Sequence, residues 1–518
     1  MATAPAFAEV ALPVPLDGAF TYSVPEALAG AHALQPGVRV RAPWGARTLS
    51  GVVVALRESA PEGFPLDRIR PLHEVIEEEP ALDAVVLAMV RWTASYYQAP
   101  LGEVMRCALP PGWDKPARRR RAAALSRPAW EPRPRITDLN PSQRAALAAI
   151  ADESTRTPLL LHGVTGSGKT AVYLAAIEAA LARGESALLL VPEIGLTPAL
   201  FADFEAAFPD LVAVLHSGLG EAERARHWKR LRAGEARVAI GTRSAVFAPV
   251  QRLGLILVDE EHDGSFKQQE APRYHGRDLA VLRAQLAGAR IVLGSATPSL
   301  ESYTHARSGK YRLFTMAERV EQRPLPSVRL VDMGEEFRRG AAAGQPGRPR
   351  RENEQLLSAE LVDAIADRLH RGQQSLLLIN RRGFAPVVMC RACGASVMCR
   401  DCSLALTYHK RSARLLCHLC GYSIDPPATC PGCGSEHLYF LGSGSEKVEE
   451  ALAAQWPAAR IARLDRDTAR SRGHFERVLA AFRAGEIDIL VGTQMIAKGH
   501  DVPGVTLVGV LQADLGLA

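Results

Sequence analysis

The chain has 518 residues, of which 47% are hydrophobic, with a mean hydropathy of −0.02, a formal net charge of +6 and a pI near 8.9. It is too long for one hydrophobic core, so we expect three or four domains. No apolar run approaches the ~18 residues of a membrane-spanning helix, and the N-terminus lacks the early basic residues of an export signal. These features predict a cytoplasmic globular protein with no membrane partner, and the basic balance mildly favours a polyanionic one.

Residues 1–110 have the pattern of a small β-rich module. Short runs rich in Val, Phe and Tyr alternate with Gly and Pro, which is typical of strands joined by turns. A helix over Ala81–Tyr97 is expected to close the module, with its aromatic residues Trp92, Tyr96 and Tyr97 in the core. By itself this module indicates no particular function.

Two basic stretches, 111–135 and 336–355, are predicted to separate the folded units. The first repeats Arg and Pro and falls short of the roughly 40 residues that a folded domain needs. Its arginines suit either phosphate contacts or a solvated tether. The second combines Gly, Pro and Arg, the composition of a flexible connector.

The strongest motif for chemistry lies in residues 136–335, where strands and amphipathic helices alternate as in an α/β unit. An apolar run beginning at Leu159 leads into a G-x-x-x-x-G-K-T loop, and a helix-period segment follows at once. This order predicts a phosphate-binding loop in which Lys169 reaches the β- and γ-phosphates and Thr170 holds Mg²⁺. The predicted contacts with the nucleotide are Gly163, Val164, Thr165, Gly166, Ser167, Gly168, Lys169 and Thr170.

An acidic motif, Asp259-Glu-Glu-His, indicates hydrolysis of the nucleotide. It follows a buried-strand run, at the end of a strand where ligands bind in an open parallel sheet. Asp259 is placed to hold Mg²⁺ and Glu260 to orient or deprotonate the attacking water. Together with Lys169 and His262 they are the candidate catalytic residues. Farther upstream, Gln143 has the amide groups needed to read an adenine edge, and it equally fits the first turn of a capped helix.

A second α/β unit, residues 356–518, is interrupted by a cysteine-rich insert at 388–437. Eight of the nine cysteines lie there as four C-x-x-C pairs, and without an export signal this favours metal over disulfides. Eight thiolates make two closed tetrahedral zinc sites. Of the three possible pairings we prefer the nested one, because the 14 residues between the inner pairs suit two strands of a ribbon. It assigns Cys390, Cys393, Cys430 and Cys433 to one zinc, and Cys399, Cys402, Cys417 and Cys420 to the other.

The motifs, at these intervals, resemble the motor of superfamily 2 helicases. Gly163–Thr170, Asp259-Glu-Glu-His and Gly294-Ser-Ala-Thr carry this similarity. Val191-Pro-Glu-Ile-Gly-Leu-Thr-Pro and Ser265-Phe-Lys-Gln-Gln-Glu make it specific to the PriA family, also called primosomal protein N′. The resemblance implies an α/β fold of two RecA-like parallel-sheet lobes, an N-terminal β-rich DNA-binding domain and a zinc-ribbon-like insert in the second lobe. It also implies ATP, Mg²⁺ and two Zn²⁺ as cofactors, with the cysteine pairs nested.

The family's activity is an ATP-dependent 3′→5′ DNA helicase that recognises stalled or branched replication forks. Such a helicase initiates primosome assembly for replication restart. The partners that this resemblance implies are forked and single-stranded DNA, other primosome proteins, single-stranded DNA-binding protein and the machinery that loads the replicative helicase.

The resemblance further implies DNA contacts in three places. The first module holds the family's pocket for a 3′ end, where Thr21 replaces a common Asp and so alters how the terminal base or hydroxyl is recognised. The loop after the acidic motif offers rings that either stack on bases, for about 1–3 kcal/mol each, or pack between strands; stacked rings would report DNA to Glu260 and His262. The expected contacts are Phe20, Thr21, Gly45 and Arg70 in the first module, Phe266, Lys267, Arg273 and Tyr274 in this loop, and Thr493 and Gln494 in the second α/β unit.

Two departures from the family pattern qualify this expectation. The stretch 111–135 leaves no room for the winged-helix domain that the family usually carries there. The sequence also reaches Ala518 before the family's last, Arg-bearing helicase motif. We therefore expect a fragment of a longer protein, with a truncated product as the other possibility. The alternative function is a fork-binding, ATP-binding scaffold with little turnover.

Overall fold

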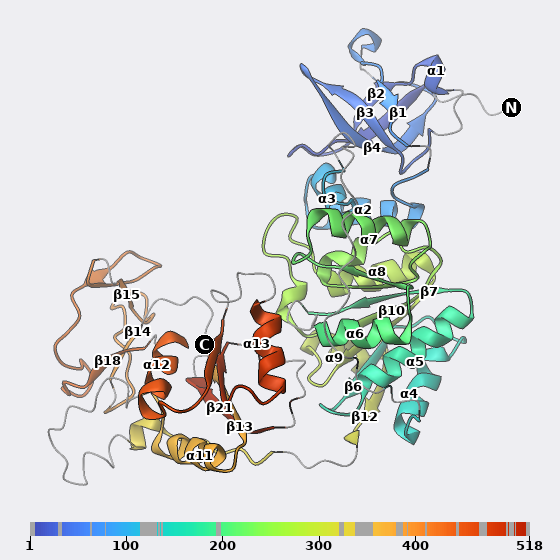
Figure 1. Ribbon diagram of the computed structural model, residues 1–518. Helices are drawn as coiled ribbons and strands as arrows, with labels where there is room; N and C mark the ends of the chain where they lie inside the picture. The colour runs from blue at the N-terminus through green and yellow to red at the C-terminus, as the bar shows by residue number, and fades with distance from the viewer. Residues whose placement is uncertain are drawn as a thin grey trace. The chain divides into compact units, whose positions relative to one another are not determined.

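The structure is a computed structural model, which divides into two compact units, Met1–Pro324 and Leu325–Ala518 (Figure 1). The predicted stretches 111–135 and 336–355 lie almost wholly outside the described residues, and so does Gln494. Within the described part, no helix has both the length and the apolar character that crossing a bilayer requires. The described residues are 6–29, 34–62, 65–77, 79–113, 132, 135, 138–192, 198–320, 326–336, 356–379, 387–390, 392–409, 412–441, 445–465, 474–493, 496, 502 and 504–513.

The N-terminal module is an antiparallel sheet of five strands, which confirms the predicted β-rich module. The strand order is β2-β1-β4-β3-β5. Alternate residues such as Val10, Val40 and Val53 point into one core, which is why these short strands form a stable sheet. Its elements are β1 (Phe7–Ala11), β2 (Phe20–Ser23), α1 (Glu26–Ala29), β3 (Arg39–Trp44), β4 (Arg47–Arg57), the short helix η1 (Leu66–Arg68) and β5 (Glu74–Val75).

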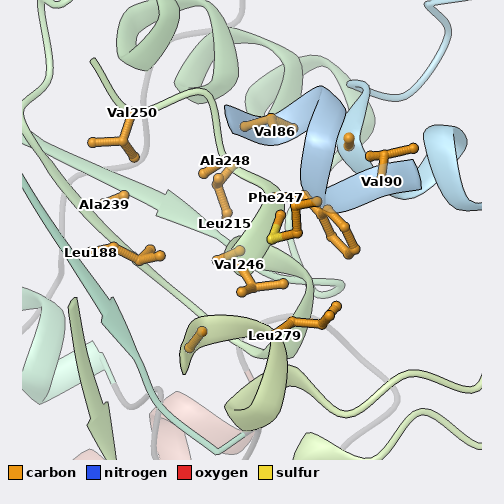
Figure 2. Close-up of a cluster of buried hydrophobic side chains, with 14 of the residues drawn as sticks. Val86, Val90, Leu188, Leu215, Ala239, Val246, Phe247, Ala248, Val250 and Leu279 are labelled. Carbon is orange, nitrogen blue, oxygen red and sulfur yellow. The ribbon is translucent and has the colours of Figure 1, made fainter. Parts of the chain in front are cut away.

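Two helices, α2 (Ala84–Tyr96) and α3 (Leu101–Ala108), join the module to the next domain. Asp83 caps α2 by accepting a hydrogen bond from the Val86 amide at 2.8 Å. The helix buries Val86 and Val90 in the same hydrophobic cluster as Phe247 and Leu279 of the helicase lobe (Figure 2). Figure 2 draws 14 side chains of this cluster, which forms one continuous core. The N-terminal module and the first lobe are therefore joined by packed side chains as well as by the backbone between them.

The aromatic residues of α2 correct one prediction. Trp92 and Tyr96 are 38% and 65% exposed, and their rings stack on each other with centroids 4.5 Å apart. Residues 86, 89, 90 and 93 form the buried face of the helix, whereas 92 and 96 are one turn apart on another face. The expectation that these two rings belong to the core was therefore wrong, because the small and branched residues of α2 supply the buried contact instead.

The first lobe, which follows the N-terminal module, is a seven-stranded sheet in the order β12-β6-β11-β10-β7-β9-β8, with every pairing parallel. Successive residues of a strand enter opposite cores: Leu160 faces one hydrophobic cluster, and Leu159 and Leu161 face the other. Its strands are β6 (Leu159–Gly163), β7 (Ser186–Leu190), β8 (Val212–Leu215), β9 (Val238–Gly241), β10 (Leu253–Asp259), β11 (Arg290–Ser295) and β12 (Arg312–Met316).

Helices cover both faces of this sheet, as the burial of both faces requires. They are α4 (Pro141–Ala151), α5 (Lys169–Ala182), α6 (Pro198–Ala207), α7 (Glu221–Arg232), α8 (Gly276–Ala287) and α9 (Leu300–Arg307), with the short helices η2 (Arg243–Phe247) and η3 (Gly264–Phe266). The predicted RecA-like parallel-sheet lobe is confirmed.

The second unit contains a parallel sheet and an antiparallel one. The parallel sheet has the order β19-β20-β13-β21, and the antiparallel sheet, which contains the cysteine-rich segment, has the order β17-β16-β15-β14-β18. The second lobe with its insert is thereby confirmed. The elements are α11 (Ala359–His370), β13 (Gln374–Ile379), β14 (Val387–Cys390), β15 (Thr407–His409), β16 (Arg414–Leu416), β17 (Ser423–Ile424), β18 (Leu438–Leu441), α12 (Ser445–Gln455), β19 (Ile461–Leu464), α13 (His474–Arg483), β20 (Ile489–Gly492) and β21 (Val505–Leu511).

An ion-pair network adds a polar link between the N-terminal sheet and the first lobe. Glu77 accepts from Arg39 of β3 at 2.7 Å and from Arg232 of α7 at 2.8 Å. Burial opposes ionisation of Glu77, but the hydrogen bonds and charges of the two arginines outweigh it and lower its pKa. The ion pairs therefore stabilise the fold fully above the ordinary pKa of a glutamate, about 4.3, and their contribution is lost as the pH falls through the lowered value.

We expect Glu77→Gln to lower the free energy of unfolding by about 1–2 kcal/mol at pH 7, since two partly buried arginines lose their charged acceptor. The difference between the parent and the variant should shrink below about pH 4. Urea unfolding across a pH series measures both. Glu9→Gln is the matched control, because Glu9 pairs with the more exposed Arg57 and the change should cost under about 0.5 kcal/mol. Equal stability of Glu77→Gln and the parent at pH 7 would contradict the role of the network.

Candidate functional site

The Gly-rich loop is built as the sequence predicts, between the end of β6 and the start of α5. Gly166 and Gly168 both have φ of +80°, a left-handed conformation that favours glycine. A Cβ atom on Gly168 would lie 2.2 Å from the Gln143 side-chain nitrogen, so no larger residue fits without rearrangement. The loop therefore needs glycine for its conformation and for the close approach of α4.

Three polar groups meet at the N-terminus of α5. The Lys169 ammonium donates to the Gly163 carbonyl at 2.9 Å across the loop. The Ser167 hydroxyl is buried and has no hydrogen-bond partner among the described residues. Thr170 follows in the first turn of the 14-residue helix. A helix N-terminus attracts anions, and together with a lysine and an unpaired buried hydroxyl it suits the oxygens of a phosphate.

Gln143 is buried and holds α4 against this loop. Its side-chain oxygen accepts from the Asn140 amide at 2.9 Å, and the Asn140 side chain accepts from the Gln143 amide at 2.8 Å. This reciprocal capping box confirms the capped-helix interpretation. The Gln143 side-chain nitrogen donates to the Ser167 carbonyl at 3.2 Å. The second hydrogen of this side-chain amide is still available as a donor to an adenine edge. That contact stays a prediction.

The acidic motif begins at the end of β10. In the sheet, β11 lies between β10 and β6, the strand that leads into the phosphate-binding loop. Asp259 is partly buried and accepts from the Tyr173 hydroxyl at 3.0 Å. Burial and the charge of Glu260 raise the pKa of Asp259 to about 6, although the Lys169 charge and the Tyr173 hydrogen bond oppose this. Burial and the neighbouring carboxylates raise the pKa of Tyr173 far above its ordinary value, so its hydroxyl stays protonated and acts as the donor.

Glu260 and His262 lie together at the turn after β10. Glu260 has φ of +46°, an uncommon left-handed conformation for a residue with a side chain. Its carboxylate lies 3.6 Å from the His262 Nδ1 atom. The same Nδ1 atom is 2.7 Å from the Ser295 hydroxyl at the end of β11. The structure therefore brings both residues beside Asp259 and links them to the next motif of the lobe.

Glu261 is a buried residue to which the sequence analysis gave no role. One of its oxygens accepts from the Ser299 amide at 2.7 Å. The other accepts from the Ser302 hydroxyl at 2.8 Å and forms an ion pair with Arg277 at 3.0 Å. The carboxylate thus ties the acidic motif to the starts of α8 and α9. The only signal in the sequence, a third acidic residue after a buried strand, does not distinguish this role from a catalytic one.

The structure corrects the prediction that aromatic rings of the following loop stack on bases. Phe266 and Tyr274 are both wholly buried in the core of the first unit, where Tyr274 packs edge-on against Phe247 with centroids 5.3 Å apart. Neither ring offers a face to a base in this structure, so the packing interpretation holds. Lys267 lies over the Tyr97 ring at 5.1 Å and donates to the Arg273 carbonyl at 2.6 Å. Lys267 and the exposed Arg273 remain the polyanion-binding candidates of this loop.

The predicted 3′-end residues gather on the N-terminal sheet. The Phe20 ring packs edge-on against Trp44 with centroids 4.6 Å apart, and Gly45, which turns the chain between β3 and β4, has φ of +55°. The Arg70 guanidinium donates to the Gly45 carbonyl at 2.7 Å. Thr21 is next to Phe20 on β2 and is paired with Glu9 of β1. The sequence analysis gave no role to Trp44, which only its contact with Phe20 distinguishes from the other aromatic residues of the module.

Thr493 directly follows β20 in the second unit, and its amide donates to the Leu464 carbonyl at 3.4 Å. Its side chain is half-buried. The end of a parallel strand is a usual place for ligand-binding residues, which agrees with the predicted role of Thr493. Contact of Thr493 with DNA or ribose stays a prediction.

The eight cysteines of the insert form two groups of four, and the membership of each group is that of the nested pairing. Within each group the sulfur atoms lie within 4.8 Å of one another. Three pairs of sulfurs, Cys390–Cys433, Cys393–Cys430 and Cys399–Cys420, are each 3.6 Å apart. A tetrahedral zinc with bonds of about 2.3 Å separates its sulfur ligands by about 3.8 Å, whereas a disulfide holds them near 2.05 Å. The donors and spacing fit zinc.

Four family models match successive parts of the chain. The 3′ DNA-binding domain of PriA matches residues 9–110, and the DEAD/DEAH box helicase model matches 140–305. The Cys-rich region domain of the PriA DNA helicase matches 399–424, and the helicase conserved C-terminal domain matches 435–518. With the two parallel-sheet lobes, these matches define a helicase of the DEAD/DEAH class, and its helicase domain implies the use of a nucleotide.

Similarity over the whole chain then identifies the family. The replication restart protein PriA of Treponema pallidum is 42% identical over 514 residues, which cover 98% of this chain and 74% of the relative. The PriA protein of Haemophilus influenzae is 34% identical over 582 residues, which cover 98% of this chain and 77% of the relative. The chain belongs to the PriA family of replication restart proteins.

The length of the match varies among the relatives. The Bacillus subtilis PriA protein is 47% identical over 390 residues, which cover 75% of this chain but only 46% of the relative. A solved structure of RecG bound to a three-way DNA junction aligns with a TM-score of 0.40 and 19% identity, covering 72% of this chain and 38% of that one. At that TM-score the family assignment depends on the relatives and family models alone.

We expect Glu261→Ala to lower the free energy of unfolding by about 2–3 kcal/mol, because it removes the buried acceptor of the Ser302 hydroxyl and of Arg277, although Arg277 keeps Asp278 as a charged partner. Ser302→Ala is the matched control. It removes one of the same hydrogen bonds without stranding a charge, and should cost about 1 kcal/mol. Thermal and urea unfolding compare both with the parent. If Glu261→Ala costs no more than Ser302→Ala, the carboxylate does not hold this part of the lobe together.

Proposed function

We propose that this chain forms the ATP-driven motor and the 3′-end-binding part of a 3′→5′ DNA helicase. The proposed helicase recognises stalled or branched replication forks and initiates primosome assembly for replication restart. The observation that carries the proposal is the meeting of a phosphate-binding loop with Asp259 and Glu260 at one edge of a parallel sheet, in a chain of the PriA family. The proposed setting is the cytoplasm.

The geometry of the first lobe supports a division of labour in hydrolysis. The loop amides of 163–170 and the Lys169 ammonium bind the phosphates, while Thr170 and Asp259 hold Mg²⁺. When bound, Mg²⁺ neutralises charge on the transferring phosphoryl group. Glu260 orients the attacking water, and His262 connects Glu260 to Ser295. Gln143 completes the proposed nucleotide contacts.

The DNA contacts that we propose combine one pocket with two basic or polar patches. Phe20, Thr21, Gly45 and Arg70 receive the 3′ end, helped by Trp44 beside Phe20. Lys267 and Arg273 of the first lobe contact phosphates, and Thr493 and Gln494 of the second lobe lie near DNA or ribose. Forked and single-stranded DNA are the nucleic-acid partners. The protein partners are other primosome proteins, single-stranded DNA-binding protein and the machinery that loads the replicative helicase.

Two Zn²⁺ ions bound by the cysteine groups complete the proposed cofactors. Each four-sulfur group is closed, so its zinc is structural, and binding stabilises the insert by on the order of 10 kcal/mol per site. The insert has a core of its own around Leu406 and Leu415, to which Cys399 and Cys417 contribute. This small core supports the idea that the metal, rather than apolar burial, stabilises the insert.

The decisive test of the proposal is ATP hydrolysis with and without forked DNA. We expect hydrolysis that rises when forked DNA is added. We expect Lys169→Ala to lower this hydrolysis at least a hundredfold while DNA affinity is kept, because the proposed role of the ammonium is in the nucleotide loop and not in DNA binding. Lys310→Ala, which changes an exposed lysine of the same lobe, is the control and should behave as the parent. A parent rate that does not change with DNA would contradict the helicase, and ATP binding without such a response would favour the scaffold alternative.

Zinc content tests the two cysteine groups. The parent should contain two Zn²⁺ per chain by elemental analysis, and Cys399→Ser should release one of them, because only its own group loses a ligand. Adding Cys420→Ser to it should release no more, whereas adding Cys390→Ser should release the second. Cys107→Ser is the control and should keep both. Loss of both ions from Cys399→Ser, or of neither, would contradict the nested assignment.

A further inference from the structure

Tyr173 lies on the helix that begins at the phosphate-binding loop. It is four residues after Lys169, and therefore on the same side of α5. Its ring is 2% exposed and packs in the hydrophobic cluster that includes Leu161 and Leu257. A phenylalanine would fill this space equally well, so packing alone does not account for the hydroxyl.

The hydroxyl of Tyr173 has one strong polar contact, the 3.0 Å hydrogen bond to the Oδ1 atom of Asp259. Asp259 is at the end of β10, so its side chain leaves the sheet where regular strand pairing stops. A carboxylate at such a position can rotate unless a partner holds it. Tyr173 provides this partner from a neighbouring helix.

Gly294 shows that the neighbouring strand leaves space for the hydroxyl. It lies on β11, directly beside Asp259 on one side and Leu161 on the other. A Cβ atom at this position would lie 1.8 Å from the Tyr173 oxygen and 3.0 Å from the ring carbon that carries it. No side chain fits there while the hydroxyl is present. The glycine of the Gly294-Ser-Ala-Thr motif thus accommodates the Tyr173–Asp259 contact.

We propose that Tyr173 is a positioning residue for nucleotide hydrolysis. Its hydroxyl holds one carboxylate oxygen of Asp259 and thereby sets the orientation in which this group ligates Mg²⁺ beside the nucleotide. Hydrogen bonds to ligating carboxylates commonly tune metal affinity in this way. The inference rests on the proposed function and adds to it a residue outside the motifs that carry the family resemblance.

Binding of a fluorescent ADP, with Mg²⁺ and with EDTA, tests this role without depending on turnover. The parent should bind ADP more tightly when Mg²⁺ is present. Tyr173→Phe should lose about tenfold of that gain, while its affinity in EDTA stays that of the parent and its melting temperature falls only by the small amount expected for one lost hydrogen bond. Asp259→Ala should lose the gain entirely. Tyr22→Phe, which removes a similar buried hydrogen bond to the Pro43 carbonyl at 3.0 Å, should keep it.

The outcomes separate the inference from the proposed function. If Tyr173→Phe keeps the whole Mg²⁺-dependent gain, or loses affinity equally in EDTA, the hydroxyl does not position Asp259 and the inference is overturned. If the parent binds no ADP under either condition, the proposed nucleotide site itself fails.

A pair of variants tests the steric part of the inference. Gly294→Ala should lower the melting temperature of the parent, because the new Cβ atom meets the Tyr173 oxygen. The same change should lower the melting temperature less in Tyr173→Phe, since the nearest atom is then the ring carbon at 3.0 Å. Equal decreases in melting temperature in the parent and in Tyr173→Phe would show that the space at Gly294 is not needed for the Tyr173 hydroxyl.

Discussion

The register of three parallel strands brings the phosphate-binding loop and the acidic motif together. Asp259 of β10 pairs with Gly294 of β11, and Gly294 pairs with Leu161 of β6, so the three strands end within about two residues of one another. The phosphate-binding loop, the acidic motif and Ser295 consequently leave the sheet at one edge. Because backbone hydrogen bonds fix this alignment, the side chains need only local contacts to meet. A shift of one strand would separate the lysine from the carboxylates.

Local contacts then hold the acidic motif in an unusual shape. Glu260 has a left-handed backbone, which costs free energy for a residue with a side chain. The residues on both sides are fixed: Tyr173 binds Asp259, and Arg277, with two serines, binds Glu261. Such contacts on both sides can maintain a strained turn that neither could maintain alone. The motif therefore combines a strained, partly buried residue, Glu260, with hydrogen-bonded neighbours on both sides.

The sequence predicted the fold class and the nucleotide loop because both depend on short-range patterns. The spacing of the glycines with Lys169 is local, and so is the spacing of the cysteine pairs. The predictions that were wrong concern which aromatic rings are buried. Trp92 and Tyr96 are exposed and Phe266 and Tyr274 are buried, although all four are similarly apolar. Their environment is decided by how α2, η2 and α8 pack, and Glu261 likewise shows its role only through contacts with residues 16 to 41 positions away.

The core shared by α2, η2 and α8 changes how mechanical load passes through the chain. Between Trp113 and the first lobe the covalent path runs through a stretch rich in Pro and Arg. The packed helices provide a second, stiff path, reinforced by Arg232 and Glu77. A pull on the five-stranded sheet would thus reach the seven-stranded lobe through close-packed side chains. Cutting the backbone within 114–131 would leave this path intact, whereas removing residues 84–108 would expose Phe247 and Leu279 to water.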